Sequence, residues 1–333
     1  MSCGQLSAAG FINGGAARPF GDCIDVIETS GLIYEYPRLR ALDEVSFSVE
    51  AGTITALVGP NGAGKTTLMR CLAGMDRPLA GSIVVNGVDV IEEPRRSHES
   101  IGYLSDFFGL YDDLTVGQSL TYVASANGVD PSGVESVVNQ TATDLGLAER
   151  LDQRAGGLSR GLRQRVAIAH AIIHAPRVVI LDEPASGLDP EARYELGELF
   201  LNLRSRGLTL LISSHILSEL EAYSTHMLIL REGRLIEHRA LDTNLESRSQ
   251  MEIEIVGEDT RLIATLEGHD RISVLERSEH GWRFVFAGGA SDRAALLRTL
   301  VDLGLEVSSF APVTEDLQQS YLRSIGRLND DES

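Results

Sequence analysis

The chain has 333 residues, a formal net charge of −19 and a hydrophobic content of 43%. This length is enough for one large domain and a smaller one, and the composition is typical of a soluble globular protein. The excess of acidic residues argues against a general electrostatic footprint for DNA or RNA, so we expect no nucleic-acid partner. No apolar run has the length that spans a bilayer, and the first residues lack the pattern of a secretory signal.

Residues 1–24 are rich in glycine and alanine and are predicted to form a disordered tail. Three cysteines without metal-binding spacing fit a reducing cytoplasm. Lys65 is the only lysine among 29 basic residues. A lysine ammonium is a compact point charge, whereas an arginine guanidinium is a broad planar fork. The single lysine therefore marks a position where arginine does not serve.

Lys65 lies in "GPNGAGKTT", residues 59–67, which fits the phosphate-binding pattern G-x-x-x-x-G-K-[ST]. The preceding "GTITALVG" predicts a strand and the following "TTLMRCLAG" predicts a helix. In that setting, backbone N–H groups wrap a β-phosphate at the helix N-terminus, and Lys65 reaches the β- and γ-phosphates. The Thr66 hydroxyl is expected to hold Mg²⁺. The predicted nucleotide-binding residues are Gly59, Asn61, Gly62, Ala63, Gly64, Lys65, Thr66 and Thr67.

The stretch "GYLSDFFGLYDDL", residues 102–114, combines four aromatic residues with three aspartates. It is too polar for a core strand and too apolar for a solvated loop. Clustered aromatic residues on a surface indicate an interface. The alternative is that two of the rings simply cover the helices that follow, at about 115–157.

A second buried strand is predicted at 177–184, "RVVILDEP", which ends in two acids. Ligands bind at the carboxyl ends of such strands. We therefore expect Asp182 to bind Mg²⁺ and Glu183 to orient or deprotonate the attacking water. A GTPase is excluded, because its N-K-x-D motif needs a second lysine.

The stretch "LSRGLRQRVAIAHAIIHAP", residues 158–176, resembles the signature of the ATP-binding cassette (ABC) family. The family motif is LSGGQ; Leu158, Ser159 and Gly161 match it, and Arg160 and Leu162 depart from it. Ser159 and the N–H groups around Gly161 are predicted to cap a helix that begins at about residue 160, whose positive end can meet a γ-phosphate. The resemblance covers residues 25–240 and implies that this motif acts across a dimer, on the nucleotide held by a second cassette.

The same resemblance assigns roles to four further residues. It places Asp189 of "SGLDP" in the D-loop and His215, after the strand "LLISS", as the switch histidine that contacts the γ-phosphate. Tyr36 is implied to stack on adenine. Asp106 aligns with the glutamine of the family's Q-loop, which makes it a candidate Mg²⁺ ligand that departs from the family pattern. Beyond it, the family docks a permease helix, so a groove with Phe107, Phe108, Leu110 and Tyr111 at its lip is expected there.

His170 and His174 are spaced as a pair on one helix face, but the glutamate of H-E-x-x-H is missing. We interpret them as helix-packing residues.

Residues 245–326 predict a strand-helix-strand-strand-helix-strand order, which is that of a ferredoxin-like α+β domain. "MEIEIV" alternates like an exposed edge strand. Ser291 is a candidate N-cap for a helix with Leu296, Leu297, Leu300 and Val301 on one face. A last helix is expected over "TEDLQQSYLRSI", and we expect this region to regulate or stabilise a dimer.

The predicted fold is an α/β P-loop cassette with a helical subdomain, followed by this small domain. The predicted function is the ATP- and Mg²⁺-dependent ATPase of an ABC exporter, which acts on a separate membrane permease at the cytoplasmic face of the membrane. The second cassette is expected to be an identical chain. The alternatives are an import cassette, or a soluble ABC ATPase that acts on ribosomes or DNA. The latter usually carries two cassettes or long coiled coils, and neither pattern is present in this sequence.

Overall fold

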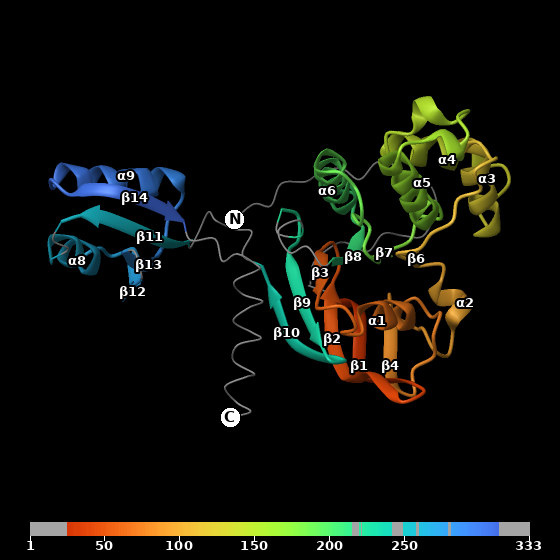
Figure 1. Cartoon of the computed structure of the whole chain (residues 1–333), viewed down its shortest axis with the longest axis horizontal. Coiled ribbons are helices and arrows are strands. Elements are labelled where there is room, and N and C mark those ends of the chain that lie inside the picture. Colours follow the sequence, from red (N-terminus) through yellow and green to blue (C-terminus); the bar gives the residue numbers. More distant parts are fainter. Residues whose placement is uncertain are drawn as a thin grey trace.

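The computed structural model describes residues 25–214, 220, 222–241, 249–257, 260–278 and 281–312 (Figure 1). The predicted N-terminal tail, His215 and the predicted last helix lie outside these residues. Within them, no helix has the length and apolar character needed to cross a membrane.

A six-stranded sheet forms the centre of the larger part of the chain, in the order β10-β9-β3-β8-β7-β6. Its strands from β9 to β6 are parallel, and β10 is antiparallel to β9. Alternate residues of the buried strands enter two separate cores: Val179 packs in one, and Ile180 in the other. The strands are β3 (Ile54–Val58), β6 (Ile101–Leu104), β7 (Val178–Leu181), β8 (Thr209–Ser214), β9 (His226–Arg231) and β10 (Arg234–Ala240).

A second sheet is antiparallel, in the order β2-β1-β4-β5. Helix α1 (Lys65–Leu72) shares one core with both sheets, since Leu68 clusters with Ile27 and with Leu57 of β3. The helix that begins at Lys65 is therefore fixed between two layers. The strands are β1 (Asp25–Tyr36), β2 (Leu39–Glu50), β4 (Ala80–Val85) and β5 (Val88–Asp89), and the short helix α2 (Pro94–Ser97) follows them.

Helices α3 (Val116–Ala126) and α4 (Val134–Asp144) follow β6, in the range where a helical subdomain is predicted (Figure 1). Thr115 caps its first helix in a reciprocal capping box with Gln118. The long helix that begins in the signature is anchored by His170, which hydrogen-bonds Ser119 at 2.9 Å and whose pKa is lowered to about 4 by burial. The prediction that His174 shares this helix is wrong, because α5 ends at Ile172; His174 lies in the turn that follows and hydrogen-bonds the carbonyl of Ile101 at 3.1 Å. The helices are α3 (Val116–Ala126), α4 (Val134–Asp144), α5 (Arg160–Ile172) and α6 (Pro190–Ser205), with 3₁₀ turns η1 (Ala148–Arg150) and η2 (Ala155–Gly157).

The C-terminal region forms its own four-stranded antiparallel sheet, in the order β12-β13-β11-β14. Its core joins Met251 and Phe284 of the sheet to Leu262 and Leu296 of the helices. The predicted order of strands and helices is confirmed. The elements are β11 (Ser249–Val256), α8 (Thr260–Glu267), β12 (Ile272–Arg277), β13 (Trp282–Phe286), α9 (Ala290–Asp302) and β14 (Glu306–Pro312).

Three details of this region were predicted wrongly. β11 lies between β13 and β14 and is not an edge strand. The prediction failed because an alternating sequence indicates that one face of a strand is buried, not where the strand lies in the sheet. α9 is capped at Gly289, whose N–H donates to the Asp292 carboxylate, so Ser291 already lies inside the helix. Val301 is 54% exposed, whereas Leu296 and Leu300 are buried.

Candidate nucleotide-binding site

The phosphate loop connects β3 to α1 at the carboxyl end of the central sheet, as predicted. At two positions of this loop only glycine fits, because a backbone carbonyl oxygen of another segment occupies the space that a Cβ would take. A Cβ on Gly59 would lie 2.2 Å from the Leu230 carbonyl oxygen. Gly64 has a φ of 104°, and a Cβ there would lie 2.5 Å from the Ala41 carbonyl oxygen. The loop is therefore held against strands β9 and β2.

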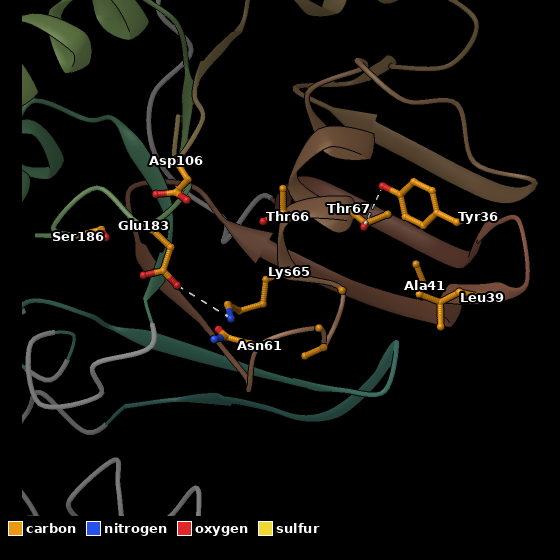
Figure 2. Close-up of a pocket in the computed structure, with 13 residues that line it drawn as sticks. Tyr36, Leu39, Ala41, Asn61, Lys65, Thr66, Thr67, Asp106, Glu183 and Ser186 are labelled. Carbon is orange, nitrogen blue, oxygen red and sulfur yellow. Dashed lines mark hydrogen bonds and ion pairs between the residues drawn. The ribbon is translucent and has the colours of Figure 1, made fainter. Parts of the chain in front are cut away.

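A cavity of about 530 Å³ opens beside this loop (Figure 2). The structure brings ten of the predicted site residues to its walls, from four separate parts of the sequence. It also adds Leu39, Ala41 and Ser186, which the site prediction did not include. The predicted residues in the walls are Tyr36, Asn61, Gly62, Ala63, Gly64, Lys65, Thr66, Thr67, Asp106 and Glu183.

Lys65 and Glu183 lie next to one another at one end of this cavity, with the ammonium nitrogen 4.0 Å from the carboxylate (Figure 2). The Lys65 ammonium also donates to the carbonyl oxygens of Gly59 at 2.8 Å and Pro60 at 3.4 Å. Its side chain is only 8% exposed. The charge is thus held among backbone carbonyl oxygens in a nearly buried position, which suits a compact ammonium better than a broad guanidinium.

Asp182 and Glu183 are held at the end of β7 by Ser213 of the neighbouring strand. The Ser213 hydroxyl donates to Asp182 Oδ1 at 2.6 Å and accepts from the Glu183 N–H at 2.9 Å. Asp182 is 1% exposed and does not line the cavity. The site prediction missed Ser213, although it stands in the strand "LLISS" two residues before His215.

Tyr36, the last residue of β1, lies at the opposite end of the cavity (Figure 2). Its hydroxyl is 3.4 Å from the Thr67 hydroxyl, and the residue is 41% exposed. Tyr34 supports the ring edge-on, with 5.0 Å between ring centroids. An exposed and supported aromatic face is available to a flat ligand at this end.

The signature residues Ser159 and Gly161 and the D-loop residue Asp189 do not line the cavity of their own chain. α5 begins at Arg160, as predicted, with the Ser159 hydroxyl accepting from the Leu162 N–H at 3.4 Å. Asp189 caps α6 through the Ala192 N–H at 2.8 Å. A Cβ on Gly161 would lie 3.3 Å from Ala192 Cβ, so the two helix N-termini are packed side by side.

The aromatic stretch 102–114 divides into exposed and partly buried residues. Phe107 is 92% exposed and Tyr111 66%. Phe108 and Leu110 pack against the core around the helices, and they line a second cavity of about 250 Å³ with Tyr103 and other residues. The alternative interpretation, that some of these rings cover the helices that follow, is thus confirmed for Phe108, whereas Phe107 and Tyr111 are exposed and their role as an interface stays a prediction.

Comparisons with known proteins agree with this geometry. Residues 42–186 match the family model described as "ABC transporter". The bacitracin transport ATP-binding protein BcrA of Bacillus licheniformis is 30% identical over 303 residues, which is 90% of this chain and 97% of that protein. The chain belongs to the ATP-binding proteins of ABC transporters.

Two further matches support this assignment. The Nod factor export ATP-binding protein I of Rhizobium etli is 31% identical over 302 residues, 90% of this chain and 93% of that protein. A solved structure of an ATP-binding subunit of an ABC transporter has 32% identity and a TM-score of 0.59, over 65% of this chain and 90% of that chain.

As an ABC transporter ATPase, the chain binds ATP and works with a membrane permease. Its phosphate loop and the acids that end β7 stand where a P-loop ATPase places them. Asp106, which is predicted to stand in place of the family's glutamine, lines the cavity next to Glu183 (Figure 2).

Proposed function

We propose that this ABC transporter ATPase drives export, and that it hydrolyses ATP in the cavity that Lys65 and Glu183 line. The observation that carries the site is the opposed pair itself: a nearly buried ammonium and a carboxylate, 4.0 Å apart at the carboxyl ends of parallel strands. The direction of transport is supported by the relative named for Nod factor export, which matches 90% of this chain.

Each wall of the cavity has a role in this proposal. N–H groups of Asn61 to Thr66 bind the β-phosphate, and Lys65 neutralises charge on the γ-phosphate. The Tyr36 ring stacks on adenine, because it offers an exposed face at the far end. The Glu183 carboxylate orients the attacking water and accepts its proton.

The residues present also fit a Mg²⁺ ion. Asp182 Oδ2 is buried and, among the described residues, has no hydrogen-bond partner, which is costly for a carboxylate unless a cation completes its contacts. Thr66 and Asp182 would hold the ion, and Asp106 would add a third oxygen ligand in place of the family's glutamine. When bound, Mg²⁺ neutralises charge on the β- and γ-phosphate oxygens.

The second half of each site comes from another cassette, which we propose is an identical chain. Ser159, Gly161 and Asp189 are the residues for that contact, since they lie at helix N-termini outside the cavity of their own chain. His215 is proposed to contact the γ-phosphate. The pair of cassettes would work at the cytoplasmic face of the membrane, where the permease holds them.

We propose that the chain has two domains, an ABC domain over residues 25–240 with a helical subdomain at about 115–157, and a C-terminal domain over 245–326. The C-terminal domain is proposed to be ferredoxin-like, which its strand order β14-β11-β13-β12 and its alternation of elements support. Its proposed role is to stabilise or regulate the dimer.

The exposed aromatic residues of the stretch 102–114 are proposed to dock the permease. The Phe107→Ala/Tyr111→Ala double variant is expected to hydrolyse ATP in isolation at the wild-type rate. It should lose at least about tenfold in affinity for the permease, because truncating an aromatic anchor removes on the order of 2 kcal/mol. Co-purification and permease-stimulated ATPase activity measure the two effects.

Phe108→Ala is the matched control, since this ring is partly buried against the helical core. Its expected effect is a lower melting temperature. Unchanged permease binding by the double variant would contradict the docking surface, as would a double variant that unfolds.

Export is tested in cells that carry Glu183→Gln at the native locus. Comparison of small molecules in cells and medium should show the transported compound enriched inside the variant cells and depleted outside. The opposite distribution would identify an import cassette. The wild-type gene supplied in trans should restore the original distribution.

A further inference from the structure

Glu183 opens a tight turn that carries part of the cavity wall. Its φ is 48°, in the left-handed region that a non-glycine residue adopts only when its surroundings hold it there. The Ser186 N–H donates to the Glu183 carbonyl at 3.0 Å and closes the turn. Ser213 fixes the beginning of the turn through the Glu183 N–H. Ser186, at its end, lines the cavity (Figure 2).

Arg160 fixes the other end of this turn. It is the first residue of α5, and its Nη2 donates to the Ser186 carbonyl at 3.1 Å. The guanidinium lies directly against Gly187, where a Cβ would be 2.3 Å from Nη2. Gly187 itself has a φ of 67°. The turn is therefore hydrogen-bonded at its beginning to Ser213 of β8 and at its end to Arg160 of the signature motif.

Arg160 differs from the neighbouring arginines of α5 in the kind of group that its guanidinium contacts. Arg163 pairs with Asp112 and Arg165 with Glu195, each at 2.6 Å. In the described part of the chain, no carboxylate pairs with Arg160, and its one hydrogen bond goes to the backbone of the turn. A cation at a helix N-terminus is disfavoured by the helix dipole, so helix stability does not account for this arginine.

We propose that Arg160 is a positioning residue for ATP hydrolysis, which holds Ser186 and thereby orients Glu183 in its own chain. The inference rests on the proposed role of Glu183 and deepens it. In this proposal the signature motif contributes to two sites. Arg160 of α5 binds the turn beside the cavity of its own chain, and Ser159 and Gly161 face the nucleotide of the second cassette. A shift of α5 would then change the orientation of Glu183 directly.

The first test is Arg160→Gly in the full chain with its permease. We expect kcat for ATP to fall about tenfold, because the free energy of one well-placed hydrogen bond is lost in the transition state. The KM for ATP should stay within about twofold, since the phosphate loop and Tyr36 are untouched. Arg160→Lys restores a donor to the Ser186 carbonyl and should recover kcat to within about threefold of wild type.

A double-mutant cycle separates positioning from general damage. Gly187→Ala forces the guanidinium away, and its positive φ adds strain of its own. Its effect on kcat should therefore be severalfold smaller in the Arg160→Gly background than in the wild type. Independent, multiplicative effects on kcat would overturn the proposal, and so would a wild-type kcat in Arg160→Gly.

Glu183→Gln, measured in parallel, distinguishes failure of the positioning role of Arg160 from failure of the proposed catalytic role of Glu183. If it is inactive while Arg160→Gly has the wild-type kcat, only the positioning role is wrong. If Glu183→Gln hydrolyses ATP at the wild-type rate, the proposed site is wrong and the inference fails with it. A lowered melting temperature with an unchanged kcat in Arg160→Gly would show a purely structural contact.

Discussion

Replacing Lys65 by alanine is expected to lower kcat for ATP hydrolysis at least about 100-fold, because it removes the cationic side chain that the described cavity lining holds against the phosphates. The described cavity lining contains no other lysine or arginine. Steady-state ATPase assays of the purified chain measure the effect, and equilibrium binding of ATP should weaken in parallel.

Lys65→Arg is the sharper version of this prediction, since it keeps the charge. The ammonium donates to the Gly59 and Pro60 carbonyl oxygens and the side chain is 8% exposed, so a planar fork cannot reproduce these contacts in the same space. We expect activity close to that of Lys65→Ala. Arg298→Ala, at an exposed position of α9, is the control and should keep wild-type activity. Wild-type turnover in Lys65→Arg would contradict the phosphate-binding role.

Replacing Glu183 by glutamine is expected to preserve ATP binding and to lower kcat by a factor on the order of 10²–10⁴, the range for loss of a general base. The amide keeps the shape of the side chain but cannot accept the proton of the attacking water. Because ATP is retained, the variant should accumulate as an ATP-bound dimer, and light scattering in the presence of ATP and Mg²⁺ measures its mass.

Two comparisons make that result interpretable. Lys65→Ala/Glu183→Gln should remain monomeric with ATP, because the nucleotide that closes the dimer is no longer held. Glu183→Gln with ADP should also remain monomeric. A Glu183→Gln chain that stays monomeric at saturating ATP and Mg²⁺ would contradict the proposed sandwich of two cassettes.

The elements that carry the site could be predicted because their signals are local. A parallel strand buried on both faces is an unbroken apolar run, so a strand could be predicted at 177–184, and β7 (Val178–Leu181) begins within one residue of that start and ends before the two acids. The phosphate loop follows from its motif and from the strand and helix beside it. Ser159 caps α5 where the sequence predicts it, since a helix N-cap is decided within three residues.

The rest depends on contacts between distant segments, for which the sequence has no local signal. Ser213 reaches Asp182 and Glu183 only because β7 and β8 are neighbours in the sheet. The contact of Arg160 with Ser186 requires two helix N-termini to pack together. In the same way, burial of Phe108 but not of Phe107 depends on the helices packed beneath them.

For Glu183, the role of candidate base could be predicted from the sequence, but its backbone conformation could not. Its position after a buried strand identifies it as a candidate base, but a φ of 48° at a non-glycine residue cannot be deduced from the sequence. That conformation exists because Ser213 and the turn to Ser186 impose it.

The central claim, that this chain hydrolyses ATP at Glu183, is tested most directly by the nucleotide that Glu183→Gln retains. The purified variant is incubated with ATP and Mg²⁺ for many wild-type turnovers, desalted and denatured, and the released nucleotide is identified by chromatography. The account predicts intact ATP, at about one molecule per chain. Release of ADP, formed at the wild-type rate, would contradict it.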